Sequence, residues 1–301
     1  KPFFLYIPYN APHFGKTDPA PRPSPAPPVQ ARPDTLALTS IKTLVRDPYA
    51  IYAQHVLGLR PLESLAKSPD ARLRGIAIHT IFERFIRDAK DDLTADRLLG
   101  IAREVLRKDV DWPSARLLWA ARIERIAEAF LEQENARQAK ARPAMFEQSG
   151  AVTIPDIGFT IKAQADRIDM DDRGGAYLYD YKTGAIPTAQ QQFNFDMQLL
   201  LLSAMALKGA FKPLLPRHVE EAVYLGVGSK LRNVPAPLED KPPMAAWADL
   251  VALIGQYLDP NKGFTARRAM EKRDDVGYFD HLSRFGEWDE TTQPKAGKVG
   301  L

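Results

Sequence analysis

A predicted β-hairpin in the middle of the chain restricts the fold more than any other feature. GFTIKAQADRID ends at residue 169, AYLYDYKTG begins at residue 176, and the turn sequence MDDRGG lies between them. Turn residues between two alternating segments are typical of a hairpin. Side chains alternate between the two faces of a strand, so Asp180 and Lys182 share one face and three tyrosines share the other. The pattern predicts a sheet with one tyrosine-rich face and one charged face.

The length of the turn decides which residues face each other across this hairpin. A three-residue loop at 172–174 would pair residues whose numbers sum to 346, which places Asp166 opposite Asp180. A two-residue loop would instead turn Asp166 to the tyrosine face. If the charges form one site, the turn must therefore be odd-membered or contain a bulge. Asp169 has the opposite parity from Asp166, so we expect it on the other face.

Two carboxylates in this position indicate a bound cation. Like charges placed opposite each other destabilise a strand pair. A hard divalent cation such as Mg²⁺ binds carboxylate and backbone oxygens while it keeps several waters. Lys182 beside such an ion could orient a metal-bound water or stabilise charge on a phosphoryl oxygen. This pattern favours metal-assisted phosphodiester hydrolysis; the alternative is a solvated Asp180–Lys182 ion pair worth less than ~1 kcal/mol.

Two helical segments carry further polar residues. His79 and Glu83, in GIAIHTIFERF, are four residues apart and share a helix face beside an apolar stripe. A histidine in this position needs a polar partner. It is either a residue of the site or a histidine at the core boundary whose hydrogen bonds are satisfied within the fold. Gln198 begins the apolar part of the segment FDMQLLLL and could be either a site residue or an ordinary boundary residue.

The periodicity along the chain predicts an α/β fold in which a small mixed sheet is flanked by helices, with additional N-terminal helices. The predicted helices cover residues 72–90, 94–108, 113–138, 188–209 and 243–258. The predicted strands lie in FEQSGAVTI, in the two arms of the hairpin and in EEAVYLGVGSK. We divide the chain into a Pro-rich arm or linker at 1–35, a domain at 36–290 and a flexible tail at 291–301. The domain has a helical part at 36–140, a sheet part at 145–230 and a C-terminal helix with its extension at 244–290.

Composition excludes several classes of site. The chain has 301 residues, a net charge of +3, a sequence pI near 8.9 and no cysteine. This charge permits a polyanionic partner without requiring one. The absence of cysteine excludes disulfides, zinc–thiolate sites, iron–sulfur clusters and cysteine nucleophiles. The longest apolar run, at 199–207, is shorter than the roughly 20 residues that cross a bilayer. We therefore expect no membrane association and a cytoplasmic location. The N-terminus, which lacks an initiator Met, suggests a domain of a larger protein.

Four motifs in a fixed order resemble those of a known nuclease family. GIAIHTIFERF, QADRID, DYKTG and QLLLLSAMA, in that order, are similar to the motifs of the RecB-like branch of the PD-(D/E)XK nuclease superfamily. Within that branch, the flanking sequences LTSIKTLVRDPYAIYAQHVLGLRPLE and GFTARRAMEKRDDVGYFDHLSRFGEW resemble the C-terminal domain of AddB subunits of bacterial AddAB helicase–nucleases. The resemblance covers roughly residues 36–290 and implies a restriction-endonuclease-like core.

The resemblance also implies roles for individual residues. Four positions match the metal-binding positions of the family: His79, Asp166, Asp180 and the carbonyl of Tyr181. Lys182 matches the catalytic lysine, next to the catalytic acids Asp166 and Asp180. Gln198 matches a glutamine that positions the lysine or the DNA, and Glu83 matches a position whose role varies.

The family implies a Mg²⁺- or Mn²⁺-dependent exonuclease that cleaves single strands unwound from DNA ends. It also implies an AddA-type helicase–nuclease partner and a role in double-strand break repair by homologous recombination. The alternatives are a catalytically silent DNA-binding or scaffolding domain of the same complex and a Cas4-like stand-alone nuclease. Some AddB proteins hold an iron–sulfur cluster through four cysteines, which this chain lacks. Five basic residues are candidate DNA contacts, unless they are ordinary surface charges: Lys162, Arg167, Arg232, Arg267 and Arg268.

Overall fold

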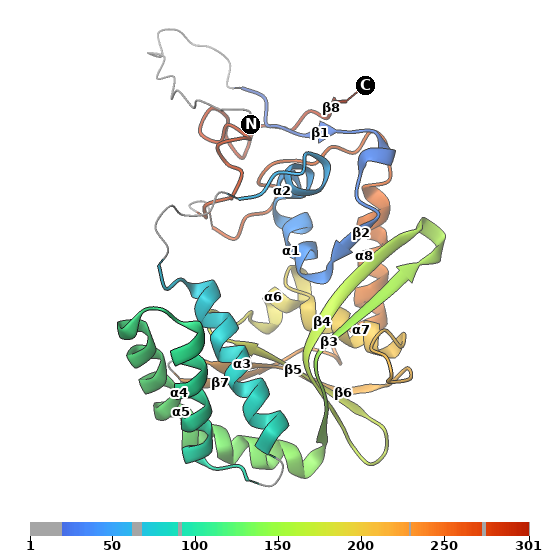
Figure 1. Ribbon diagram of the computed structural model, residues 1–301. Helices are drawn as coiled ribbons and strands as arrows, with labels where there is room; N and C mark the ends of the chain where they lie inside the picture. Colours follow the sequence, from blue (N-terminus) through green and yellow to red (C-terminus); the bar gives the residue numbers. More distant parts are fainter. Residues whose placement is uncertain (1–19, 62–67, 90–91, 229, 273–274, 301) are drawn as a thin grey trace.

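A six-stranded mixed sheet separates two groups of helices in the computed structural model (Figure 1). The structure describes residues 20–61, 68–89, 92–228, 230–272 and 275–300. The strand order is β2-β4-β5-β6-β7, and β3 also pairs with β4. This arrangement confirms the predicted α/β fold with a small mixed sheet between helices.

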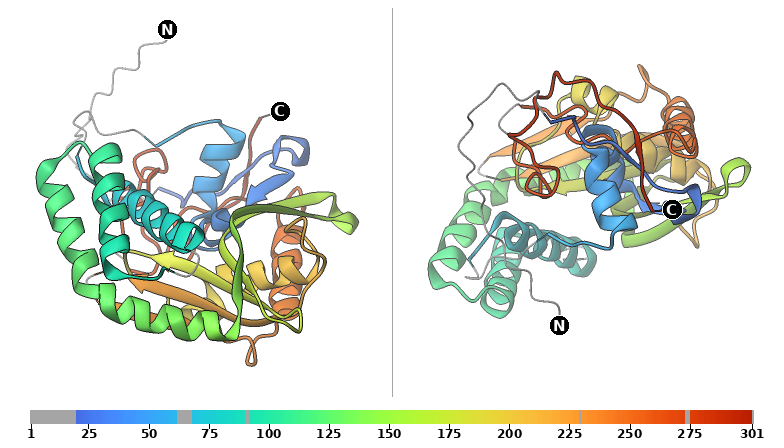
Figure 2. Two further views of the ribbon diagram at one scale, coloured as in Figure 1. Left: turned by 60° about the horizontal axis from the view of Figure 1, so that its bottom comes forward. Right: turned by 90° about the horizontal axis from the view of Figure 1, so that it is seen from above.

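The strands combine antiparallel hairpins with two parallel pairs. β3 pairs antiparallel with β4, β4 with β5, and β6 with β7, whereas β2 runs parallel to β4 and β5 parallel to β6. The strand bounds are β2 Thr35–Ala37, β3 Arg142–Ile154, β4 Phe159–Met170, β5 Ala176–Lys182, β6 Val219–Val227 and β7 Leu231–Pro235. The short edge strand β7 was not expected from the sequence. In both figures the tip of the β3–β4 hairpin projects beyond the rest of the sheet (Figures 1 and 2).

Three helices cover the tyrosine face of the sheet. They are α3 Ala71–Ala89, α4 Ala95–Asp109 and α5 Pro113–Lys140, and their bounds agree with the predicted helices to within two residues. The side chain of Thr94 caps α4 by accepting a hydrogen bond from the amide of Arg97. Phe82 of α3 stacks on Tyr181, with ring centroids 5.6 Å apart. The tyrosines therefore pack the helical layer against the sheet. Figure 2 shows α3, α4 and α5 beside the sheet.

The opposite face packs against α1 Leu38–Arg46, α2 Pro48–Ile51, α7 Gln198–Leu207 and α8 Pro243–Gln256. The single helix predicted over 188–209 is wrong in one respect, because it consists of α6 Ala189–Asn194 and α7 with a break between them. Asp196, in the break, is buried and forms ion pairs with Lys42 and Arg46 of α1, 2.6 and 3.2 Å away. These contacts oppose continuation of the helix, and the break makes Gln198 the first residue of α7.

The N-terminal and C-terminal segments are packed where the structure describes them. β1 Pro25–Ala26 pairs in parallel with β8 Gly297–Lys298. Arg22 and Arg32 are buried and donate hydrogen bonds to backbone carbonyls, Arg22 to Ala266 and Arg32 to Tyr257. Within the predicted Pro-rich arm or linker at 1–35, the described residues 20–35 are thus packed against the domain, and Gly297–Lys298 of the predicted flexible tail pair with them. A Pro-rich segment has few backbone N–H groups with which to join a sheet. Arginine side chains hold it instead by donating hydrogen bonds to carbonyl oxygens. Residues 1–19 lie outside the described part of the chain.

None of the helices that the structure describes is both long enough and apolar enough to cross a membrane.

The packing of the N-terminal segment can be tested with Arg32→Ala. Arg32 donates to the carbonyls of Pro27, Tyr257, Asp259 and Pro260, so the substitution leaves several carbonyls without a charged donor. We expect the free energy of unfolding in urea to fall by about 2–3 kcal/mol. Arg173→Ala, at an exposed turn position, serves as the control and should change it by less than ~0.5 kcal/mol. Equal effects of the two substitutions would contradict the proposed packing.

Candidate active site

The β4–β5 hairpin has the register that the charged residues require. Arg167 pairs with Tyr179 and Met170 with Ala176, so paired residue numbers sum to 346. Asp171 and Gly175 close a loop of three residues, because the amide of Asp171 donates to the carbonyl of Gly175 at 3.0 Å. The prediction of an odd-membered turn is confirmed. The same register, continued along the strands, places Asp166 opposite Asp180 on the face away from the helices α3–α5.

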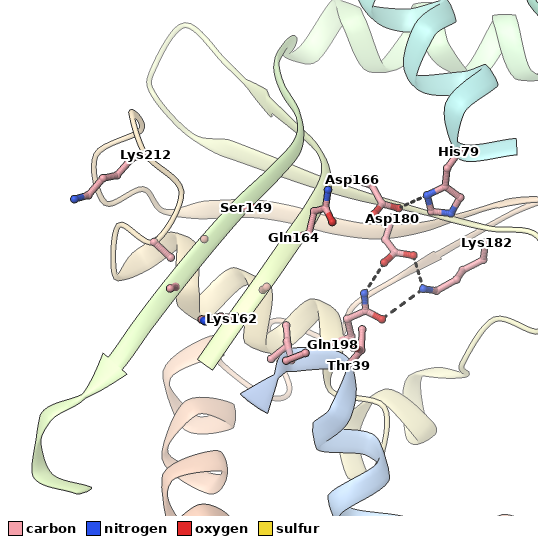
Figure 3. A pocket seen from close by; sticks show the side chains of 16 residues that line it. Thr39, His79, Ser149, Lys162, Gln164, Asp166, Asp180, Lys182, Gln198 and Lys212 are labelled. Atoms are coloured by element: carbon pink, nitrogen blue, oxygen red, sulfur yellow. Dashed lines mark hydrogen bonds and ion pairs between the residues drawn. The ribbon is translucent and has the colours of Figure 1, made fainter. Parts of the chain in front are cut away.

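Asp180, Lys182 and Gln198 form a closed set of contacts. Lys182 Nζ lies 2.7 Å from Asp180 Oδ2, and Gln198 Nε2 donates to Asp180 Oδ1 at 2.7 Å. Lys182 Nζ also donates to Gln198 Oε1 at 3.4 Å, and it lies over the ring of Tyr224, 5.1 Å from its centroid. Asp180 is only 2% exposed. Gln198 at the start of α7 thus contacts both the carboxylate and the ammonium group (Figure 3).

His79 reaches the other end of the carboxylate pair from α3. Its Nε2 lies 2.7 Å from the carbonyl oxygen of Tyr181, and its Nδ1 lies 3.3 Å from Asp166 Oδ2. Asp166 Oδ2 also accepts a hydrogen bond from the amide of Tyr181 at 2.9 Å. Burial lowers the pKa of His79, while the charge of Asp180 acts in the opposite direction. The histidine on the apolar helix face therefore has polar partners, and they are the other predicted site residues.

The electrostatics of this group fit a divalent cation. Burial, followed by the charge of Asp180, raises the pKa of Asp166 well above its usual range. Burial disfavours the charged carboxylate, and a second carboxylate across the hairpin disfavours it further. Two carboxylates, an imidazole and the carbonyl of Tyr181 are a donor set suited to Mg²⁺ or Mn²⁺. His79, Asp166, Asp180 and Tyr181 are thus the residues that could hold the ion.

Glu147 of β3 is a nearby acidic residue that the sequence interpretation missed. Ligand atoms of His79, Glu147 and Asp166 lie within 4.8 Å of one another. Burial, followed by the charges of Glu83 and Asp180, raises the pKa of Glu147. The four-residue turn PDIG could have revealed it, since Ile154 pairs with Phe159 and the same register puts Glu147 opposite Asp166. Glu83 itself forms an ion pair with Arg87 at 2.6 Å.

A cavity of about 890 Å³ opens over the site. Its lining includes His79, Asp166, Asp180, Lys182 and Gln198, together with Lys162 and Lys212 from neighbouring segments. Figure 3 shows Lys162 on the β3–β4 hairpin and Lys212 on a loop on the other side of β3 from the carboxylates. The small residues Gly150, Ala151 and Ala163 also line the cavity, so the part of its wall that the hairpin forms carries short side chains.

Comparison with known families identifies the superfamily of the chain. The family model described as the PD-(D/E)XK nuclease superfamily matches residues 35–276, which include every residue of the cluster. The chain belongs to the PD-(D/E)XK nuclease superfamily. Membership in this nuclease superfamily agrees with the mixed sheet and with the acidic pair beside a lysine.

Several relatives of this PD-(D/E)XK chain have been described. An uncharacterized protein of Rickettsia bellii is 28% identical over 185 residues, which are 60% of this chain and 22% of that protein. An ATP-dependent helicase/deoxyribonuclease subunit of Streptococcus mutans is 27% identical over 171 residues, 54% of this chain and 15% of that protein. The chain thus spans less than a quarter of the length of these relatives.

Two solved structures show only a distant likeness. An exonuclease candidate from Eubacterium rectale has 10% identity and a TM-score of 0.43, with 84% of this chain and 94% of that chain covered. SSO0001 has 17% identity and a TM-score of 0.30, with 75% of each chain covered.

Two of the five predicted DNA contacts are buried in the PD-(D/E)XK fold, so the prediction is wrong for them. Arg167 is 0% exposed and forms ion pairs with Glu134 and Asp169, 2.7 and 2.6 Å away. It shares the odd parity of Asp169, so strand alternation turns both residues toward the tyrosine face and α5. Arg267 is 2% exposed and forms ion pairs with Asp280 and Glu290. Buried, paired guanidinium groups are not available to phosphates.

The other three candidate contacts are exposed but lie in different places. Lys162 lines the cavity over the site. Arg232 lies on the edge strand β7, and Arg268 follows the buried Arg267; neither residue lines that cavity. Lys212, which the sequence interpretation did not single out, lines it instead.

The buried ion-pair cluster behind the site can be tested with Arg167→Met. The substitution leaves Asp169 without its guanidinium partner, whereas Glu134 keeps only its ion pair with Arg137, at 2.9 Å. We expect the free energy of unfolding, measured in urea, to fall by about 3–5 kcal/mol. Arg232→Met, at an exposed position, should change it by less than ~0.5 kcal/mol. A loss below ~1 kcal/mol for Arg167→Met would show that the cluster is not needed for stability.

Proposed function

We propose that this chain is the nuclease domain of an AddAB-type helicase–nuclease. In this proposal it hydrolyses phosphodiester bonds of single DNA strands released at unwound duplex ends, in the cytoplasm, with Mg²⁺ or Mn²⁺ bound. The observation that carries the proposal is that Asp166, Asp180 and Lys182 line one cavity, with Lys182 Nζ 2.7 Å from Asp180 Oδ2. The similarity to the helicase/deoxyribonuclease protein of Streptococcus mutans supports the AddA-type partner and the role in double-strand break repair by recombination.

The site residues divide the work of hydrolysis. When bound, the divalent cation supplies Lewis acidity and a water of lowered pKa. Asp180 and Gln198 hold the Lys182 ammonium group in one place, where its charge stabilises negative charge that develops on a phosphoryl oxygen. The amide of Tyr181 orients the Asp166 carboxylate, and the carbonyl of Tyr181 orients the His79 ring. Each reacting group is thus fixed by a second contact, which limits reorganisation during the reaction.

The cavity supports a single nucleic-acid strand as the substrate. Lys162 of the β3–β4 hairpin and Lys212 of a neighbouring loop add to the positive charge of Lys182 in the cavity, so several phosphates of one strand would meet a cation. The small side chains of Ala151 and Ala163 in the cavity lining leave room for the backbone of the strand. These contacts are to phosphates, which carry no sequence information. We therefore propose a nuclease without sequence preference.

Catalysis can be tested with Lys182→Met and Asp166→Asn in the full-length protein together with its helicase partner. Each substitution removes a group that acts on the reacting phosphate or on the cation, so we expect single-strand cleavage to fall by at least ~100-fold. DNA unwinding, measured in parallel, should be unchanged. Arg232→Ala, on the far edge strand, should retain cleavage within about twofold. Full cleavage by both site variants would overturn the assignment, and a wild-type complex that binds DNA without cleaving it would favour a silent binding domain.

The DNA path can be tested by the salt dependence of binding to a single-stranded oligonucleotide. Three lysines line the cavity, Lys162, Lys182 and Lys212, and neutralising about three phosphates gives a log–log slope of about −2 for single strands. Lys162→Ala and Lys212→Ala should each reduce the magnitude of the slope by about 0.7. The control Arg268→Ala should leave it unchanged. The same slope in all three variants would contradict this path.

A further inference from the structure

Glu147 lies beside the proposed cation site but belongs to a strand that carries none of the family's metal-binding motifs. Ligand atoms of His79, Glu147 and Asp166 lie within 4.8 Å of one another, and the three residues come from α3, β3 and β4. In the β3–β4 ladder, Phe146 pairs with Arg167 and Gln148 with Ala165. Glu147 is therefore opposite Asp166, and residues opposite each other share a face of the sheet.

The carboxylate of Glu147 differs from the other acidic groups in this region. Asp180 contacts Lys182 and Gln198, Glu83 forms an ion pair with Arg87, and Asp166 accepts from the amide of Tyr181. For the half-buried side chain of Glu147, the described part of the chain provides neither a hydrogen-bond donor nor an ion-pair partner. Its backbone adopts φ +46°, a conformation that is uncommon for residues other than glycine.

The charges around Glu147 favour a bound cation, rather than a donor group of the protein, as the partner of its carboxylate. Glu83 of α3, Asp166 of β4 and Asp180 of β5 all act on this region, and Lys182, which acts on Asp166, is already paired with Asp180. An imidazole and two carboxylates from three elements would hold a divalent cation, which would keep its remaining positions for water or phosphate. The residues present thus fit a divalent cation without any contribution from Asp180.

We propose that Glu147 is a ligand of the divalent cation and that it completes, with His79 and Asp166, a site that binds the ion before DNA arrives. The inference rests on the proposed metal-dependent nuclease function. Its consequence is a division of roles within the site: Glu147 sets the affinity for the ion, whereas Lys182 and Gln198 act on the phosphate. Because the three ligands come from α3 and from two strands, the ion also links the helical layer to the sheet.

The test is Mn²⁺ binding by the full-length protein without DNA, followed by electron paramagnetic resonance of the free ion. Glu147→Gln keeps the size of the side chain but removes its charge, so we expect the dissociation constant for Mn²⁺ to rise at least tenfold. The matched control Glu128→Gln, on an exposed face of α5, should bind Mn²⁺ like the wild type. A second readout is the thermal midpoint, which Mn²⁺ should raise in the wild type and in Glu128→Gln but much less in Glu147→Gln.

The outcomes separate this inference from the proposed function. If the wild type binds Mn²⁺ in a manner sensitive to His79→Ala and Asp166→Asn, but Glu147→Gln binds it equally well, Glu147 is not a ligand and only the inference fails. If the wild type does not bind Mn²⁺, or if those two variants bind it unchanged, the proposed metal site itself fails. Should Glu147→Gln not fold, Glu147→Asp decides, because it keeps the charge and draws it back by one methylene group. Wild-type affinity in that variant would overturn the proposal.

Discussion

The opposition of Asp166 and Asp180 across the β4–β5 hairpin is the constraint on which the site depends. Two carboxylates at facing positions repel each other, and Asp180 is almost completely buried. The fold meets this constraint from two sides. The start of α7 brings Gln198 to Asp180, beside Lys182, and α3 brings His79 to Asp166. The helix break at Asp196 and the packing of Phe82 on Tyr181 are therefore as important for the site as the charged residues.

The tyrosine face provides the rigid support for this arrangement. There the positive charge of Arg167 lies between Glu134 and Asp169, and its guanidinium carbon is 5.1 Å from the ring centroid of Tyr179. One strand, β4, thus carries two clusters of charged residues. The cluster on one face is completed, because Arg167 is paired with the carboxylates around it, and the cluster on the other face is incomplete, because it has more carboxylates than cations. The completed cluster contributes to the packing of α5 against the sheet. The incomplete cluster has an excess of carboxylates, which is the property expected of a cation site in a PD-(D/E)XK nuclease.

Much of this could be predicted from the sequence because it depends on neighbours in the chain. The helices α3, α4 and α5 have strong periodicity, and their ends agree with the prediction to within two residues. The DDRGG turn fixes the register of the hairpin, so the facing of Asp166 and Asp180 follows from counting residues. The same counting around the PDIG turn would have found Glu147, but the first strand carried no motif that drew attention to it. The parity that Arg167 shares with Asp169 places it on the tyrosine face, although the sequence interpretation took Arg167 for a DNA contact.

The sequence by itself determined the two faces of the hairpin, the order of the motifs and the residue types that favour a divalent cation. These are properties of a period-two strand and a short turn, and they need no distant partner. Only the tertiary structure decided which charges remain available. Arg267 is neutralised by Asp280 and Glu290, Lys212 reaches the cavity from a loop, and the Pro-rich segment is held by carbonyls that follow α8. These results depend on contacts between segments far apart in the chain, and local patterns carry no information about such contacts.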